Sequence, residues 1–280
     1  MYRKAQLLGV NRSLLYRKRA DRTARIAQDN EIEMRLQELA VEFSGGGYRM
    51  LTGHLSREGL PVNSKRVRRI MRNAGLFKRK KRRWVKTTDS EHGLKVFPNL
   101  IKDTRPTGLD QIWVADLTYI RLPRGFCYLA AILDAYSRRV IGWHVSQEID
   151  AALAIAALDR ALETRRPAPG LIHHSDRGVQ YACKDYIERL KTARARPSMS
   201  AKGTPRENAQ AESFFRTLKT EEVYMQEYQT LAEVRSSVAH FIEDIYNRKR
   251  LHSALKYVPP AEFEATINLN PPSMNTEVVV

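Results

Sequence analysis

Apolar side chains in the first third of the chain recur every three or four positions, which is the spacing of amphipathic helices. The clearest series is Ile32, Leu36, Leu39, Ala40 and Phe43. Three consecutive glycines at 45–47 end that helix. Two shorter helices are expected at 48–58 and 64–74, joined by a turn that begins at Gly59. The pattern therefore predicts a small all-helical region.

The second short helix has an apolar stripe of Val67, Ile70 and Met71. Cations cover its other sides: Lys65, Arg66, Arg68, Arg69 and Arg72. Two short helices with a glycine-containing turn and a basic second helix are typical of a helix-turn-helix DNA-binding domain. An ordinary helical hairpin with a solvated basic face explains the pattern about equally well. We expect an N-terminal helical segment over 1–25 and the helix-turn-helix domain over 26–77.

The pattern changes to that of strands from residue 111 onward. A stretch at 112–120 is apolar on both faces, as in a central strand, and strands at 126–133 and 140–145 follow after short connections. Further elements are expected in the order helix 151–163, strand 171–174, helix 184–191, a loop, helix 208–222 and helix 231–248. An antiparallel meander followed by alternating helix and strand is the order of the ribonuclease-H-like fold. This core is expected over 105–265, with a flexible tail over 266–280.

Charge is distributed unevenly along the chain, whose formal net charge is +17. Residues 1–100 hold 24 Lys and Arg against 9 Asp and Glu, whereas residues 101–280 hold 24 against 22. Six consecutive cations mark a basic linker within 78–104: Lys78, Arg79, Lys80, Lys81, Arg82 and Arg83. A basic surface concentrated in one third of the chain favours nucleic acid as the partner. The sequence contains no run of eighteen apolar residues, so no membrane span is expected. Its two cysteines, Cys127 and Cys183, predict neither a disulfide framework nor a zinc site.

Three acidic residues are candidates for catalysis. Asp116 lies within the expected central strand, where aspartate is disfavoured and its charge is costly to bury without compensation. Asp176 directly follows a short strand, although a turn aspartate before Gly178 explains it equally well. Glu212 lies on a helix, where a surface pair with Arg216 would also explain it. Only the combination of the three acids distinguishes a catalytic set from these ordinary structural explanations.

The spacing of these acids and the segments around them resemble those of a known protein family. Fifty-nine residues separate Asp116 from Asp176, and 35 separate Asp176 from Glu212. The neighbouring segments read WVADLTY at 113–119, HSDRGVQY at 174–181, SMSAKG at 198–203 and NAQAESFFRTLK at 208–219. With these segments the chain resembles the DDE transposase and retroviral-integrase superfamily, in which the last two acids typically show the 35-residue gap. It most resembles the second-frame (OrfB) transposases of bacterial insertion sequences, over nearly its whole length.

The resemblance implies an α/β fold: a ribonuclease-H-like integrase core with a mixed five-stranded sheet and flanking helices, preceded by the small helix-turn-helix domain. It implies that Asp116, Asp176 and Glu212 hold two Mg²⁺ ions, which Mn²⁺ could replace, with Asp116 bridging both. Lys219 is expected to contact DNA near the scissile phosphate, although a solvated lysine fits the spacing as well. His174 and Ser175 are expected either to support Asp176 or to fill buried structural positions.

The resemblance also implies partners and an activity. The activity is DNA strand cleavage and strand transfer during transposition of an insertion sequence. The expected partners are double-stranded DNA (element ends and target), further copies of the chain on DNA, and an upstream-frame protein with which the chain is fused or cooperates. The expected location is the bacterial cytoplasm, at the nucleoid.

One position departs from the family pattern, because Glu207 stands where the family usually has aspartate. Reduced activity is the worst outcome expected from this change, since the charge is retained. Two alternative functions remain open. A catalytically silent DNA-binding remnant or regulator of the element predicts damaged acids, and all three are present. A ribonuclease-H-type nuclease acting on RNA–DNA hybrids needs neither the helix-turn-helix nor the basic arm.

Overall fold

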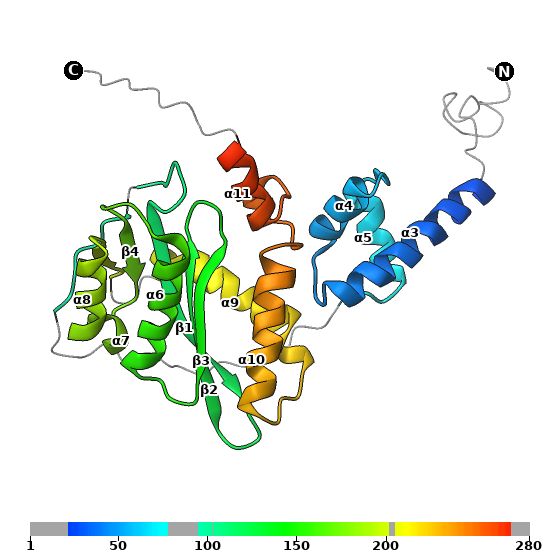
Figure 1. Cartoon of the computed structure of the whole chain (residues 1–280). Helices are drawn as coiled ribbons and strands as arrows, with labels where there is room; N and C mark the ends of the chain where they lie inside the picture. The colour runs from blue at the N-terminus through cyan, green and yellow to red at the C-terminus, as the bar shows by residue number, and fades with distance from the viewer. Residues whose placement is uncertain (1–21, 78–94, 103, 202–204, 270–280) are drawn as a thin grey trace, which may run out of the picture.

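A small helical domain and a larger α/β core make up the computed structural model, which describes residues 22–77, 95–102, 104–201 and 205–269 (Figure 1). The helical domain consists of α3 (Arg22–Glu42), α4 (Tyr48–Arg57) and α5 (Ser64–Asn73). Its core contains the series expected from the sequence, with Ile32, Leu36, Leu39 and Phe43 all buried. The Asn63 side chain caps α5 by accepting a hydrogen bond from the Lys65 backbone N–H at 2.8 Å. The boundary expected between residues 25 and 26 falls inside α3.

The core is built on a five-stranded mixed sheet, as expected. Its strands are β1 (Ile112–Arg121), β2 (Phe126–Asp134), β3 (Val140–Ser146), β4 (Ile172–Ser175) and β5 (Arg196–Met199), in the order β3-β2-β1-β4-β5. β1 pairs antiparallel with β2, and β2 with β3, whereas β4 runs parallel to β1 and to β5. β1 is therefore the central strand, with partners on both sides.

Helices cover both faces of the sheet, and alternate residues of β1 face the two layers. On one face lie α6 (Ala151–Arg165), α7 (Val179–Ala182) and α8 (Lys184–Thr192), which share a buried cluster with Trp113 and Ala115. On the other lie α9 (Ala209–Glu221) and α10 (Leu231–His240), which share a cluster with Ile112 and Val114. Asp116 lies two positions after Val114 on the same strand.

Two elements correct the sequence-based expectations. β5 lies within the stretch between residues 191 and 208 that was expected to be a loop. α11 (Pro260–Leu269) continues past residue 266, where the tail was expected to begin. The expected helix over 231–248 is α10 continued by a π-helical turn, Phe241–Tyr246. Short 3-10 turns complete the described chain at Pro205–Asn208, Val223–Met225 and Ser253–Leu255.

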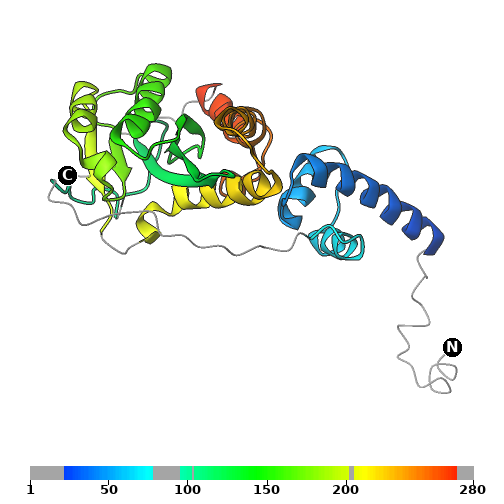
Figure 2. The ribbon, with the colours of Figure 1, turned by 90° about the horizontal axis from the view of Figure 1, so that it is seen from below.

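The helical domain packs against the C-terminal end of α9 (Figure 2). Gly45 lies so close that a Cβ there would be 3.2 Å from the Thr220 carbonyl oxygen. Lys249 Nζ lies 2.6 Å from a Glu42 carboxylate oxygen across the same junction. Residues of α3, α4 and α5 share one buried cluster with α9 and α10. The two parts therefore share a hydrophobic core.

None of the helices in the described ranges is both long enough and apolar enough to span a lipid bilayer.

Close packing of α6 on β3 predicts a stability effect at Gly142. A Cβ at this position would lie 2.3 Å from the Ala157 carbonyl oxygen and 2.7 Å from Ala161 Cβ. We expect Gly142→Ala to lower the free energy of unfolding by about 1–3 kcal/mol, the usual cost of overpacking. Thermal denaturation measures the change. Gly47→Ala is the matched control, because nothing lies within 4 Å of a Cβ there; equal melting temperatures for the two variants would contradict the prediction.

Candidate active site

The two aspartates lie on neighbouring parallel strands. Asp116 is in the middle of β1, and Asp176 comes directly after the last residue of β4. The observed register pairs Val114 with His174, so two further steps along both strands bring Asp116 level with Asp176. Adjacent strands are about 4.8 Å apart. The topology therefore places the two carboxyl-bearing residues side by side at the edge where β4 ends.

Glu212 reaches the same place from α9, where it lies in the first turn. The start of α9 is fastened to the central strand: Asn208 Nδ2 donates a hydrogen bond to the Ala115 carbonyl oxygen at 3.0 Å, and Asn208 is buried. This contact joins the residue just before α9 to the residue just before Asp116. All three acids are half-buried, so the site is open to a ligand.

Burial raises the pKa of two of the acids, and for Asp116 the neighbouring carboxylates add to the shift. Burial, followed by the neighbouring Asp176 and then Glu212, raises the pKa of Asp116 to about 8, against an opposing hydrogen bond from the Leu117 N–H. Burial also raises the pKa of Glu212, with Arg216 opposing it. Asp176 Oδ1 accepts a hydrogen bond from the Gly178 N–H at 2.9 Å. The three acids interact electrostatically, and a bound cation would relieve their repulsion.

Within the described ranges, no three His, Cys, Asp or Glu side chains are already arranged to hold a metal ion. The donor set nevertheless fits a hard divalent cation, since Mg²⁺ takes carboxylate oxygens and keeps several waters rather than requiring a closed protein cage. The residues present therefore fit the metal that the sequence implies.

Lys219 lies two turns after Glu212 on α9 and faces the same region. Its ammonium nitrogen lies 4.2 Å from the centroid of the Tyr119 ring, a cation–π distance. Burial lowers the pKa of Lys219, and attraction to Asp116 opposes that shift. The lysine therefore lies against the Tyr119 ring, within electrostatic reach of Asp116.

Buried histidines support the strand that carries Asp176. His174 Nδ1 lies 2.9 Å from Ser198 Oγ on β5, and His173 Nε2 lies 3.0 Å from the Tyr186 hydroxyl. Ser175 Oγ donates to the Asp176 backbone oxygen at 3.0 Å. The structure thus places His174 in a buried hydrogen bond between strands and Ser175 against the Asp176 main chain.

Comparison with known proteins is decisive. The integrase core domain family matches residues 106–205, a second integrase core domain family matches 193–260, and an HTH-like domain family matches 27–84. The chain is 36% identical over 262 residues to the insertion element IS600 uncharacterized 31 kDa protein of Shigella sonnei, covering 92% of this chain and 96% of that one. It is 40% identical over 215 residues to the transposase InsF for insertion sequence IS3A of Escherichia coli (strain K12), covering 76% and 75%. The chain belongs to the insertion-sequence transposases.

The fold agrees with this assignment. A solved simian T-cell lymphotropic virus intasome, in complex with the PP2A regulatory subunit B56 gamma, superposes with a TM-score of 0.51 at 14% identity, covering 87% of this chain and 79% of that one. The transposase is a polynucleotidyl transferase of the DDE class with an integrase core, a kind of core that typically binds divalent metal.

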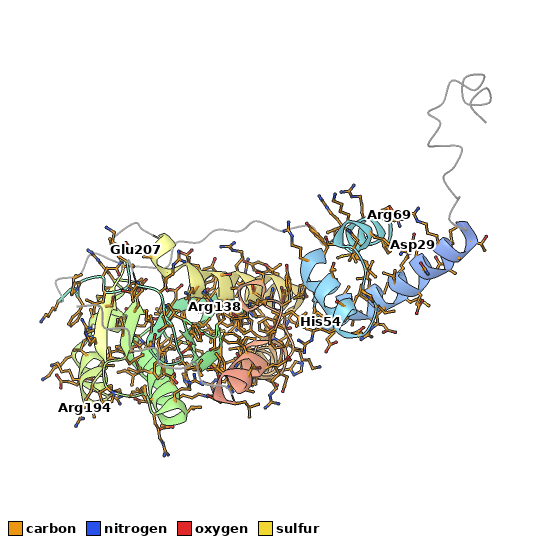
Figure 3. The ribbon with its side chains drawn as sticks, turned by 90° about the horizontal axis from the view of Figure 1, so that it is seen from above. Asp29, His54, Arg69, Arg138, Arg194 and Glu207 are labelled. Carbon is orange, nitrogen blue, oxygen red and sulfur yellow. The ribbon has the colours of Figure 1, made fainter. Side chains whose placement is uncertain are left out.

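The cations of α5, the candidate recognition helix of the transposase, differ in their pairing within the protein. Arg66 Nε and Arg69 Nη2 lie 2.7 and 2.6 Å from the two carboxylate oxygens of Asp29 on α3, and Asp29 and Arg69 lie side by side in Figure 3. Lys65, Arg68 and Arg72 are exposed. The six linker cations from Lys78 to Arg83 lie outside the described residues. Asp29 therefore pairs with two of the five cations of α5, of which Arg69 also remains exposed.

Several residues at these sites escaped the sequence-based prediction. Asp29 could not be singled out because its ion pair with Arg69 joins residues 40 positions apart, and no local sequence pattern predicts such a contact. Tyr48 receives the guanidinium groups of Arg49 and Arg68 at 5.1 and 5.6 Å from its ring centroid. Glu207 accepts a hydrogen bond from the Ala201 N–H at 2.6 Å, so the glutamate that departs from the family pattern reaches the end of β5.

A buried neutral histidine predicts acid sensitivity of the fold. Burial lowers the pKa of His173 from about 6.5 to about 3, so the unfolded chain takes up a proton first on acidification. The stability this group contributes is fully present above about pH 6.5 and is lost as the pH falls toward 3. We expect His173→Gln to flatten the decline of unfolding free energy with pH by up to about 1.4 kcal/mol per pH unit.

Denaturant titrations between pH 7 and 4 measure this slope. His240→Gln is the control, since His240 is exposed on α10 and its replacement should leave the slope as it is. A His173→Gln slope equal to that of the unmodified chain would refute the assignment.

Proposed function

We propose that this transposase cleaves a DNA strand at the end of its insertion sequence and joins the exposed end to target DNA. In this proposal Asp116, Asp176 and Glu212 are the metal ligands. One observation carries it: three acids from β1, the end of β4 and the start of α9 interact electrostatically, and Asp116 has a pKa raised to about 8 by burial and by its acidic neighbours. A purely structural aspartate in a central strand is not expected to lie beside two further acids.

Two Mg²⁺ ions, replaceable by Mn²⁺, would be held by these three carboxylates. When bound, the cations supply charge compensation at the reacting phosphate, where the transition state carries additional negative charge. The half-buried setting strengthens each of these electrostatic contacts relative to water. Lys219, which lies against the Tyr119 ring, would hold a DNA phosphate beside the site.

The reaction balances without a covalent enzyme intermediate. A water oxygen attacks the phosphorus at the element's end, the bond to the 3′ oxygen breaks, and that oxygen leaves as a 3′ hydroxyl. This hydroxyl then attacks a phosphodiester of the target, losing its proton as the new ester bond forms. The displaced target oxygen takes up a proton and leaves as a new 3′ hydroxyl.

Double-stranded DNA is the partner in both steps. Lys65, Arg68 and Arg72 would contact phosphates or base edges from α5, with Arg66, Arg69 and the linker cations Lys78–Arg83 as additional phosphate contacts. We further propose that the transposase acts as a homo-oligomer on DNA at the bacterial nucleoid, and that an upstream-frame protein contributes by fusion or by association.

The proposal is tested by strand cleavage and joining on a duplex that carries the DNA flanking this gene, with the full chain and Mg²⁺. We expect Asp116→Asn to lower both activities by more than about 100-fold, beyond the usual cost of losing a residue outside the ligand set. Glu163→Gln is the matched control, because Glu163 is exposed on α6, across the sheet from α9. Comparable activity of Asp116→Asn and the unmodified chain would rule the mechanism out and favour a DNA-binding remnant.

The pairing of Asp29 with α5 predicts a gain in DNA affinity. Asp29→Asn removes the carboxylate that neutralises Arg66 and Arg69, so both become available to phosphates. We expect the slope of log Kd against log salt to steepen by about 1–2 units, since each additional phosphate contact contributes about 0.9. Fluorescence anisotropy with a labelled duplex measures it.

Asp185→Asn is the charge-matched control for this measurement. Asp185 is exposed on α8, so its removal changes the net charge equally without releasing an arginine on α5. Identical slopes for the two variants would mean that Asp29 does not limit DNA binding.

A further inference from the structure

The hydroxyl of Tyr181 is buried and has no hydrogen-bond partner among the described residues. Tyr181 lies on α7, and its side chain is only 2% exposed. Buried tyrosine hydroxyls usually find a partner, because an unmet donor in the protein interior is costly. An orphaned hydroxyl at this depth points to a partner that joins it in another state of the protein.

The ring of Tyr181 is held firmly by its surroundings. It contacts the Tyr186 ring edge to face, with centroids 5.4 Å apart. A Cβ at Gly178 would be 3.6 Å from Tyr181 Cδ2 and 3.0 Å from Asp176 Oδ1. The tyrosine ring and the Asp176 carboxylate therefore flank the same glycine.

The hydroxyl also lies within electrostatic reach of both aspartates of the site. After burial and Tyr186, the carboxylates of Asp116 and Asp176 contribute to raising the pKa of Tyr181 well above its ordinary value. Each of these carboxylates uses one oxygen, Oδ1, to accept a backbone N–H, from Leu117 and Gly178 respectively. A carboxylate that binds a cation through one oxygen is commonly oriented by a hydrogen bond to the other.

We infer that Tyr181 is a positioning residue for the metal site: its hydroxyl donates a hydrogen bond to the Asp116–Asp176 carboxylate pair when a divalent cation is bound. The inference rests on the proposed function, because it assumes that this pair binds metal. In the metal-bound state this hydrogen bond would supply the acceptor that the Tyr181 hydroxyl lacks. Tyr181 touches neither cation nor DNA in this role; it acts through the carboxylates.

Tyr186 provides an unusually close control. It is buried beside Tyr181, yet its hydroxyl is already paired with His173 Nε2 at 3.0 Å. Removing the two hydroxyls should therefore have opposite consequences. Tyr181→Phe removes an unmet donor from the metal-free protein, whereas Tyr186→Phe breaks an existing hydrogen bond.

The experiment measures Mn²⁺ binding by titration calorimetry and the metal-free melting temperature, on the full chain and both variants. We expect Tyr181→Phe to leave the melting temperature equal or higher and to raise the Kd for Mn²⁺ by about 10-fold. Tyr186→Phe should lower the melting temperature and leave the Kd for Mn²⁺ unchanged.

Each other outcome is informative. If the unmodified chain binds no Mn²⁺, the proposed metal chemistry itself fails and this inference falls with it. If the unmodified chain binds and Tyr181→Phe binds equally well, only the inference is overturned. Equal weakening by both phenylalanine variants would also overturn it, because the effect would then reflect general loosening of the α7–α8 layer.

Discussion

Electrostatic repulsion among three carboxylates is the constraint on which the rest of the site depends. The fold brings Asp116, Asp176 and Glu212 together from three elements, and burial makes their repulsion stronger than it would be in water. Desolvation of the buried Asp116 carboxylate, together with this repulsion, raises its pKa to about 8, so it favours its protonated form near neutral pH in the absence of metal. The protein holds this unfavourable arrangement because the sheet and α9 are stabilised elsewhere. A divalent cation is the simplest species that makes all three charges favourable at once.

Helix α9, which carries Glu212, is anchored at both of its ends. At its start, Asn208 is bonded to the Ala115 carbonyl oxygen beside Asp116. At its end, the carboxylate of Glu221 accepts two hydrogen bonds of 2.8 Å from the Arg250 guanidinium, and both side chains are largely buried. The helical domain then packs on the neighbouring Thr220 through Gly45. The position of Glu212 is thus set by contacts at both ends of α9, one of them made with the helical domain.

Much of the fold could be predicted because it follows from local patterns. Alternation and apolar runs predicted β1 to β4, and a spacing of three to four residues predicted α3. β5 was missed because Arg196–Met199 is only four residues long and contains a proline. Both features are typical of a loop in a sequence pattern. The spacing and neighbouring motifs of the three acids allowed them to be predicted as the catalytic set. Tyr181 could not be predicted, because the burial of its hydroxyl without a partner depends on packing between α7, α8 and β4, which no sequence pattern reports.

The charge of the chain is a poorer guide to DNA binding than its value of +17 suggests. Many cations are already neutralised within the fold. Arg165 and Arg139 both pair with the buried Glu264, at 2.9 and 2.6 Å, and Arg250 pairs with Glu221. On α5 itself, Asp29 engages two of the arginines. Because counterion release depends only on cations that meet phosphate, the pairing inside the protein limits how many of these cations could contribute to DNA binding. The exposed side of α5 is then a smaller and more directional basic surface than the sequence alone implies.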